Sequence, residues 1–287
     1  MIYMKAQTFL ILFIFFVAVF FRPLQAQVTR IFESDTIFKG PESVAYDELR
    51  NCLYVSNYNR YPRDGMIYNE DYITKIDLNG HILEKVLVNE LTCPTGICVL
   101  KDKLYIVERF GVVVFNLQEN KTETRYRINN TQFLNDIAVD SAGTIYVSDS
   151  GSDIIYRIKD GVCEKWYEGQ EIDRTNGVLV DGDRLIVGVN ADSSLKAINM
   201  TDMTVDLIAT LPQGTIDGIK KCSKGYLVSH YDGNLYLTGN DGKITELLNT
   251  RPEGIKCADF EYIEKLGLLY IPALKNNRLF IYRYKCE

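Results

Sequence analysis

Short apolar segments that alternate with polar positions follow one another from about residue 28 to the end of the chain, with turn residues between them. The clearest copy predicts four strands, at residues 135–139, 144–148, 154–159 and 163–167. Alternation of this kind, bounded by pairs such as Asp160-Gly161, is typical of β-hairpins. Because no stretch after residue 27 keeps a helical period, the pattern predicts an all-β fold.

A polar residue followed by an apolar run opens most copies of this pattern. Successive openings lie 53, 40, 41, 41 and 41 residues apart. A fixed period of this size is typical of a propeller, in which each repeat forms one blade. The sequence therefore predicts a six-bladed β-propeller that occupies residues 27–287 as a single domain. The six opening residues are Glu42, Thr95, Asn135, Asn176, Asp217 and Ala258.

The two ends of the repeat array predict how the ring closes. The last copy stops after its third strand, Arg278 to Tyr284, and the segment from Val28 to Glu33 has strand character without a partner of its own. Pairing the two segments would remove two exposed sheet edges, so we expect an N-terminal strand to complete the last blade. The other second strands are expected at residues 53–56, 104–107, 185–189, 226–229 and 268–271.

The first period is longer than the others because of an insertion from Tyr58 to Tyr72, between the second and third strands. In a propeller this loop lies on the face where the inner strands begin. The insertion carries four tyrosines, and two interpretations remain open: an aromatic flap over a pocket or a decorated surface loop.

The first 26 residues are expected to be a signal peptide. Lys5 precedes an apolar run from Phe9 to Phe21, and Ala26 ends a segment of the type that signal peptidase cleaves. The run is shorter than the about 20 residues of a membrane span, and an uncleaved N-terminal anchor is the alternative. The expected location is therefore the periplasm or the exterior, with no membrane association after cleavage.

The net charge narrows the range of partners, and the cysteines raise the question of disulfides. The formal net charge is −6, and removal of Lys5 and Arg22 with the signal peptide changes it to −8. This acidity argues against nucleic acid and anionic membranes, and favours a small molecule as the partner. The seven cysteines are an odd number, and Cys93 and Cys98 are close enough in sequence to consider as a disulfide pair.

Four opening residues carry side-chain oxygens that the propeller would bring to one mouth of its central channel. Glu42, Asn135, Asn176 and Asp217 are therefore predicted to bind a hard divalent cation, with calcium preferred and zinc, magnesium and manganese as alternatives. Asn-Gly and Asp-Gly pairs are also common in turns, so a purely structural ring of capped strands is the competing interpretation.

Further residues near the mouth are candidates for catalysis and substrate binding. Asp217 or His230 is the expected proton acceptor. Asn135, Asp149, Arg109 and Tyr58 are expected to contact substrate, against the alternative that they are polar or aromatic residues of the rim.

Four short motifs occur in order along the chain. They are Pro41-Glu42, Asn135-Asp136 followed by Asp140-Ser141-Ala142-Gly143, Thr175-Asn176-Gly177, and Ile216-Asp217-Gly218. In order and spacing they resemble the senescence-marker-protein/gluconolactonase family, with regucalcin and, more distantly, the paraoxonases. The resemblance implies a six-bladed propeller with a divalent ion held by Glu42, Asn176 and Asp217, while Asn135 contacts the ion or the substrate. It also implies metal-dependent hydrolysis of a lactone or related ester.

The chain departs from that family at one position of the mouth. Phe133 stands where the sugar-lactone enzymes place an arginine, which argues against gluconolactone itself as substrate. The paraoxonase-like pair of histidines is not evident either. Two further functions therefore stay open: a non-catalytic propeller that binds a small ligand or a protein, with a structural metal or none, and a strictosidine-synthase-like enzyme that uses a glutamate.

Overall fold

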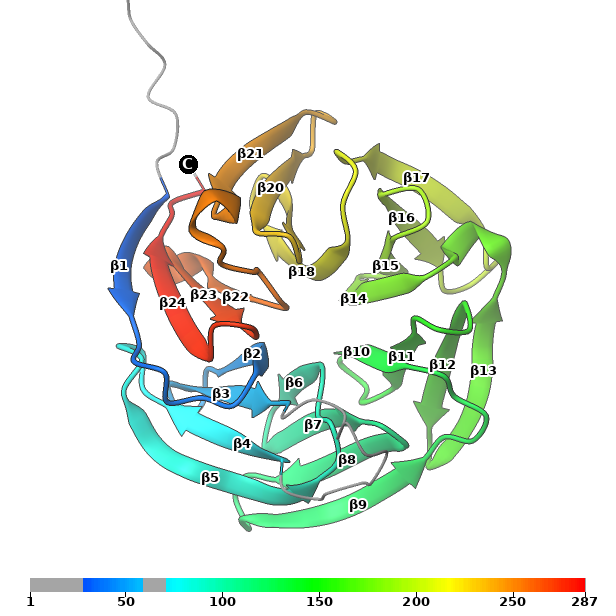
Figure 1. Ribbon diagram of the computed structural model, residues 1–287. Coiled ribbons are helices and arrows are strands. Elements are labelled where there is room, and N and C mark those ends of the chain that lie inside the picture. The colour runs from blue at the N-terminus through cyan, green and yellow to red at the C-terminus, as the bar shows by residue number, and fades with distance from the viewer. Residues whose placement is uncertain (1–27, 59–70, 287) are drawn as a thin grey trace, which may run out of the picture.

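Six antiparallel four-stranded sheets surround a central axis in the computed structural model, which describes residues 28–58 and 71–286 (Figure 1). Each sheet is one blade, and the blades are numbered 1 to 6 by the order of their inner strands along the chain. Within a blade the strands run outward from the axis in chain order, except in blade 6, where the N-terminal strand is the outer strand. The six-bladed propeller is therefore confirmed. The predicted signal peptide lies outside the described residues, and so do residues 59–70 of the insertion, for which a flap and a surface loop are the two interpretations.

The strands fall into four rings, from the axis to the outer edge. The inner strands are β2 (Pro41–Asp47), β6 (Ile97–Leu100), β10 (Leu134–Val139), β14 (Thr175–Asp181), β18 (Ile216–Cys222) and β22 (Glu261–Ile263). The second strands are β3 (Cys52–Asn57), β7 (Lys103–Glu108), β11 (Ile145–Asp149), β15 (Arg184–Val189), β19 (Gly225–His230) and β23 (Leu268–Ala273). The third strands are β4 (Asp71–Ile76), β8 (Gly111–Asn116), β12 (Ile154–Lys159), β16 (Ser194–Asn199), β20 (Asn234–Gly239) and β24 (Arg278–Arg283). The outer strands are β5 (Ile82–Leu91), β9 (Lys121–Arg127), β13 (Val162–Glu168), β17 (Val205–Thr210), β21 (Ile244–Asn249) and, in blade 6, β1 (Thr29–Glu33).

The described helical structure consists of three short 3₁₀ turns, η1 (Gln170–Ile172), η2 (Arg251–Glu253) and η3 (Glu264–Leu266). Among the described residues, no helix has the length and apolar character needed to cross a bilayer.

The N-terminal strand closes the ring as predicted. β1 pairs antiparallel with β24, with Thr29 opposite Arg283. The inner strand of this blade is shorter than expected and begins at Glu261. The reason is that the preceding segment bonds across to blade 1, where the Asp259 amide donates to the Glu42 carbonyl over 3.0 Å.

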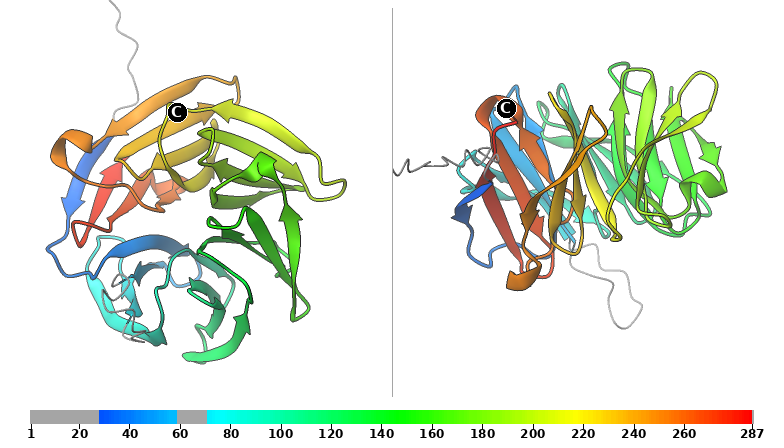
Figure 2. Two further views of the ribbon diagram at one scale, coloured as in Figure 1. Left: turned by 45° about the vertical axis from the view of Figure 1, so that its right-hand side comes forward. Right: turned by 90° about the horizontal axis from the view of Figure 1, so that it is seen from above.

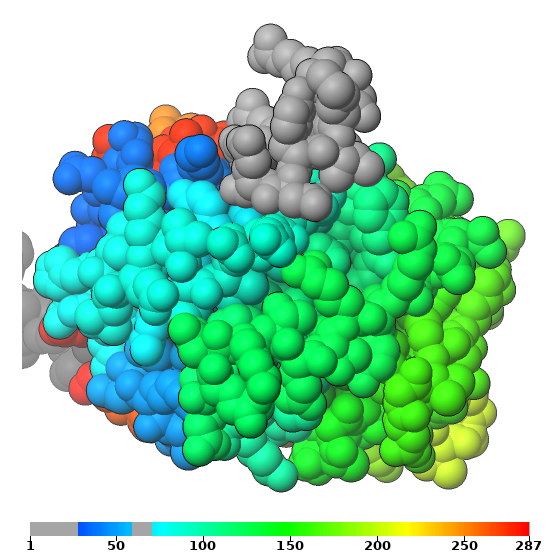
Figure 3. All heavy atoms as spheres, turned by 90° about the horizontal axis from the view of Figure 1, so that it is seen from below, coloured from blue at the N-terminus to red at the C-terminus, as the bar shows by residue number. Residues whose placement is uncertain are grey.

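The core consists of six apolar clusters, one at each interface between neighbouring blades. At the closing interface, for example, Val44 and Leu53 of blade 1 share a cluster with Tyr270 and Leu279 of blade 6. Figure 2 shows the sheets packed face to face around the ring, and Figure 3 shows adjoining blades in contact along the outer edge. Burial between every pair of blades holds the inner strands in place around the channel.

Candidate functional site

A bulge in four inner strands positions the predicted ligands at the mouth of the channel. In blades 1, 3, 4 and 5 the pairing with the second strand shifts at the opening residue, as between Ile216 and Ile219. A bulge takes residues out of the ladder and re-aims their side chains, and bulges are frequent beside active sites. The residues within these shifts include Glu42, Asn135, Asn176 and Asp217.

Serines on the second strands satisfy the backbone that three of these bulges release. In each case the backbone amide of the residue after the opening residue donates to the hydroxyl of a serine that is the next-to-last residue of the second strand of the same blade. The pairs are Ser43 with Ser56 at 2.9 Å, Asp136 with Ser148 at 3.0 Å, and Gly218 with Ser229 at 2.8 Å. Because a buried amide without a partner is costly, these hydroxyls stabilise the bulged geometry.

The bulged strands surround a cavity of about 380 Å³ at the mouth. All four predicted ligands line it, together with Thr95 of blade 2, whereas Ala258 of blade 6 is fully buried. The predicted convergence of opening residues from separate blades is therefore present in the structure. The remaining lining residues are Tyr58, Phe133, Thr215, Tyr231, Leu274 and Lys275.

The floor of this mouth cavity contains polar atoms that lack partners. Asn176 Nδ2 donates to Asp217 Oδ1 over 2.8 Å, and Asn135 Nδ2 donates to the Ser150 hydroxyl over 3.1 Å. Within the described residues, Glu42 Oε2 and Asn176 Oδ1 are buried and accept no hydrogen bond. An unsatisfied buried acceptor costs free energy, and contact with a cation would remove that cost.

The electrostatics of the floor also favour a bound positive charge. Burial raises the pKa of Glu42 well above its usual range, and repulsion by Asp217, Asp259 and Asp136 raises it further. Burial also raises the pKa of Asp217 to about 7, with Asp259 adding to the effect and the hydrogen bond from Asn176 opposing it. Acidic groups with raised pKa values in one buried place take up either protons or a cation.

The donor set fits a hard divalent ion. Two carboxylates and two amide oxygens are ligands of the kind that calcium accepts in irregular geometry. Among the described residues no three His, Cys, Asp or Glu side chains form a metal-binding group, so the proposed set depends on the amide oxygens of Asn135 and Asn176. Zinc, which prefers nitrogen and sulfur ligands, fits this set less well.

Two predicted site residues have a different environment from the one expected. Asp149 and His230 occupy the last positions of β11 and β19, and both are fully buried outside the lining of the mouth cavity. The Asp149 carboxylate accepts hydrogen bonds from the backbone amides of Gln132 at 2.9 Å and Phe133 at 2.7 Å. It therefore holds the loop that leads into β10, and its placement does not support contact with substrate.

His230 is enclosed behind the loop that contains Gly214. A Cβ atom on Gly214 would lie 2.3 Å from His230 Nδ1, and the imidazole packs edge-on against the Tyr236 ring at 4.9 Å. Burial, with a smaller contribution from Arg251, lowers the pKa of His230 to about 4. A neutral, enclosed imidazole is poorly placed to accept a proton at the mouth.

The two remaining predicted contacts differ from each other. Tyr58 lines the mouth cavity as expected. Arg109 does not line it, and its guanidinium lies 5.5 Å from the centre of the Phe110 ring.

A second layer beneath the floor was not predicted from the sequence. Asp136 accepts hydrogen bonds from the amides of Ile137 and Val178, and Asp259 accepts one from the Ser43 hydroxyl at 2.5 Å. The sequence feature that could have predicted this second layer is the residue after each opening residue, which is either glycine or a small polar residue. The series is Ser43, Gly96, Asp136, Gly177, Gly218 and Asp259.

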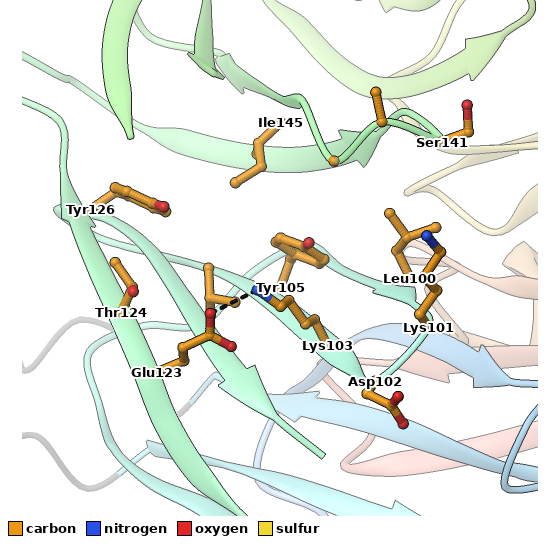
Figure 4. A pocket seen from close by; sticks show the side chains of 13 residues that line it. Leu100, Lys101, Asp102, Lys103, Tyr105, Glu123, Thr124, Tyr126, Ser141 and Ile145 are labelled. Atoms are coloured by element: carbon orange, nitrogen blue, oxygen red, sulfur yellow. Dashed lines mark hydrogen bonds and ion pairs between the residues drawn. The ribbon is translucent and has the colours of Figure 1, made fainter. Parts of the chain in front are cut away.

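A cavity of about 410 Å³ between blades 2 and 3 is a weaker candidate site. It is lined by the turns at the opposite ends of β6 and β10, and Figure 4 shows Lys103 paired with Glu123 of the same blade in its lining. The ion pair measures 2.7 Å between Lys103 Nζ and Glu123 Oε1. Lys103 and Glu123 neutralise each other, and none of the described residues that line this cavity has a buried polar side-chain atom without a partner. The mouth cavity, by contrast, has two such oxygens.

Comparison with protein-family models and with curated protein sequences found no match. Among solved structures, a gluconolactonase from Xanthomonas campestris is similar with a TM-score of 0.70, at 17% identity over 94% of each chain. A catalytically inactive variant of virginiamycin B lyase from Staphylococcus aureus, solved with quinupristin, has a TM-score of 0.64 at 12% identity. That match covers 90% of this chain and 99% of the lyase chain. At these identities, the likeness shows that the chain shares the fold of these proteins.

Proposed function

We propose that the protein is an exported, metal-dependent hydrolase that opens a lactone or ester at the mouth of its channel. The observation that carries the proposal is the buried floor of the mouth cavity, where Glu42 and Asp217 meet two asparagine side chains and two oxygens have no partner. Similarity in fold to a gluconolactonase supports the reaction class by analogy. Export rests on the expected signal peptide.

The residues of the floor have distinct roles in this mechanism. A divalent cation held by Glu42, Asn135, Asn176 and Asp217 would polarise the substrate carbonyl and lower the pKa of a bound water. The hydrogen bond from Asn176 fixes Asp217 through Oδ1, and Asp217 Oδ2 would then be the oxygen that accepts a proton. Ser150 fixes the Asn135 amide through its nitrogen, so that the amide oxygen is available to the ion or the substrate.

A second candidate function is the binding of a small ligand without turnover. It is favoured by the composition of the cavity lining. Among the described residues the lining contains no histidine, and its two carboxylates, Glu42 and Asp217, are both proposed ligands of the ion, so no separate proton acceptor is present. In that case the ion would be structural and Asp217 would act only as its ligand.

Metal content and turnover distinguish the two functions. The purified protein is freed of metal with a chelator, reloaded with calcium, and assayed with δ-valerolactone and phenyl acetate. Calcium binding with hydrolysis that the chelator abolishes supports the hydrolase. Calcium binding without hydrolysis supports the binding function, and hydrolysis that is unchanged by the chelator would show that the proposed mechanism is wrong.

A further inference from the structure

The rim of the mouth cavity divides into an apolar arc and a polar arc. One residue follows each second strand at the mouth, and the six in ring order are Tyr58, Arg109, Ser150, Asn190, Tyr231 and Leu274. Three of them, Tyr231, Leu274 and Tyr58, belong to the consecutive blades 5, 6 and 1 and line the cavity. They form the apolar arc.

The three polar residues of the rim, Arg109, Ser150 and Asn190, are not part of the lining of the mouth cavity, and two of them form hydrogen bonds within the protein. The Ser150 hydroxyl accepts from Asn135 and donates to the Thr175 carbonyl over 2.7 Å. The Asn190 side chain accepts from the Ile216 amide over 2.6 Å. The Ser150 hydroxyl and the Asn190 amide oxygen are therefore less available to the hydroxyls of a sugar.

The apolar arc keeps surface that a ligand can cover. Tyr58, Tyr231 and Leu274 are each partly exposed, and so is Phe133, which lines the cavity from blade 3. Covering such surface favours binding in proportion to the apolar area removed from water. Lys275, the cation in the lining, lies with its Nζ atom 5.8 Å from the centre of the Tyr231 ring.

We propose, on the basis of the hydrolase function above, that the substrate is a lactone or ester with an alkyl or aryl group. Its carbonyl lies at the floor with Glu42 and Asp217, and its apolar part lies against Tyr231, Leu274 and Tyr58. A polyhydroxylated sugar lactone would place several hydroxyls against the tyrosine ring faces and the Leu274 side chain, where they would lose hydrogen bonds to water, which is costly.

A matched set of δ-lactones tests the substrate class. δ-Valerolactone and δ-decalactone share the reacting ring and differ by a pentyl chain, and glucono-δ-lactone carries hydroxyls instead. We expect kcat/KM for δ-decalactone to exceed that for δ-valerolactone by about tenfold or more. Leu274→Asn should remove most of this preference, whereas Leu207→Asn, at an exposed leucine of the outer strand β17, should leave it unchanged.

Binding of the corresponding δ-lactams, measured by thermal shift, separates the substrate class from the reaction. A thermal shift with the pentyl-substituted lactam and none with the unsubstituted lactam supports binding of an apolar group by the apolar arc. If no lactone is hydrolysed in addition, the hydrolase function is overturned but the apolar binding site is not. Equal shifts for the two lactams, or a preference for glucono-δ-lactone, would overturn the apolar substrate and leave the hydrolase standing if turnover is seen.

A second inference comes from two cysteines that lie close together. They are near the C-terminal end of β18, which is the end of the strand away from Asp217. Cys222 is the last residue of β18, and Cys286 lies in the tail that follows β24. Their Sγ atoms are 2.9 Å apart. The tail is also held in place by the Ser223 hydroxyl, which donates to the Cys286 carbonyl over 3.2 Å.

We propose that Cys222 and Cys286 form a disulfide that fastens blade 5 to the C-terminal end of blade 6. The two thiols would transfer two electrons and two protons to a small disulfide such as glutathione disulfide, which leaves as two thiols. The bridge would close a loop across 64 positions and would hold together the blade that completes the ring. This disulfide is independent of the proposed reaction.

Thiol counting by mass spectrometry tests the bridge. The protein is equilibrated with a glutathione redox buffer at an oxidising ratio, denatured, and alkylated without reductant. We expect five of the seven cysteines to react, with one cross-linked peptide containing Cys222 and Cys286. Reduction, or Cys286→Ser, should lower the Tm by about 5–10 °C, whereas Cys163→Ser should not. Alkylation of all seven, or a cross-link between other cysteines, would overturn the proposal.

Discussion

The side-chain amide of Asn176 donates a hydrogen bond to Oδ1 of Asp217 over 2.8 Å, between residues that open neighbouring blades 41 positions apart. The bond leaves Asn176 Oδ1 buried without a partner. It therefore arranges both side chains with free oxygens at the floor of the mouth cavity. A purely structural cap would satisfy its polar atoms with its own backbone, and this pair does not.

Asp217→Asn should weaken ion binding without lowering the stability of the metal-free protein. Loss of one of two carboxylates should weaken calcium binding by about 100-fold or more, since even outer partners of metal ligands are worth about 10–100-fold. The metal-free variant should be at least as stable as the metal-free wild type at pH 8, because a buried carboxylate with a raised pKa is destabilising there. Titration calorimetry and urea unfolding measure the two effects.

The matched control is Asp232→Asn, which changes an aspartate that is 46% exposed and lies outside the mouth cavity. It should leave calcium affinity within about twofold of wild type, since screened surface charges contribute little. Equal calcium affinity in Asp217→Asn and wild type would remove Asp217 from the site.

Removal of the ion should lower thermal stability. A ligand that binds only the folded state at about 100 times its Kd stabilises by about 2.7 kcal/mol. For a domain of this size that corresponds to a rise in Tm of about 5–10 °C on adding calcium to the chelated protein. Differential scanning calorimetry in calcium and in chelator measures the shift. An identical Tm in the two buffers would mean that no stabilising ion binds.

Much of the fold was predictable because the repeat is visible in the order of residues. The period of the opening residues, the turn pairs and the unpaired segment before Glu42 determine the number of blades and the closing strand. The convergence of Glu42, Asn135, Asn176 and Asp217 follows from the same argument, since equivalent positions of a propeller share one radius and one height.

The direction of side chains at the strand ends was not predictable in this way. Asn57, Asp149 and His230 occupy equivalent positions in blades 1, 3 and 5 and are all fully buried. Asn57 accepts from the Lys39 amide just as Asp149 accepts from the Phe133 amide, so this position holds the loop before the inner strand. Only the three-dimensional structure distinguishes a residue that holds a loop from one that faces the channel.

Gly177→Ala should disturb the site through the backbone of its neighbour. A Cβ atom at Gly177 would lie 2.4 Å from the backbone oxygen of Asp217, so the inner strands of blades 4 and 5 must move apart. We expect a loss of about 1–3 kcal/mol in the free energy of unfolding and weaker calcium binding. Urea unfolding and calorimetry measure both.

Gly169→Ala is the control for this substitution. The nearest atom to its new Cβ, at 2.4 Å, is the end of the flexible Glu171 side chain, which can turn away. Its cost should stay below about 1 kcal/mol, with calcium affinity unchanged. A Gly177→Ala protein with unaltered calcium binding would show that the ligands tolerate separation of the two blades.

His230 should make stability depend on pH. Its pKa is lowered from 6.5 to about 4 by burial, so the folded state remains neutral while the unfolded state takes up a proton. The contribution of His230 is therefore fully present above pH 6.5 and is lost as the pH falls towards 4, by up to about 3 kcal/mol. Urea unfolding between pH 7 and pH 4 measures this loss, and His230→Gln, which cannot titrate, should lack it.

Carboxylates also titrate in this range, so the informative quantity is the difference between wild type and variant at each pH. That difference should shrink as the pH falls from 6.5 to 4, because only the wild type loses the contribution of a neutral buried imidazole. His81→Gln changes an imidazole that is 71% exposed and should give a difference that varies much less with pH. If the wild-type and His230→Gln stabilities ran parallel across the whole range, His230 would be able to hold a proton in the folded state. The enclosed position behind Gly214 would then have to open, and a role for His230 as proton acceptor at the mouth would return.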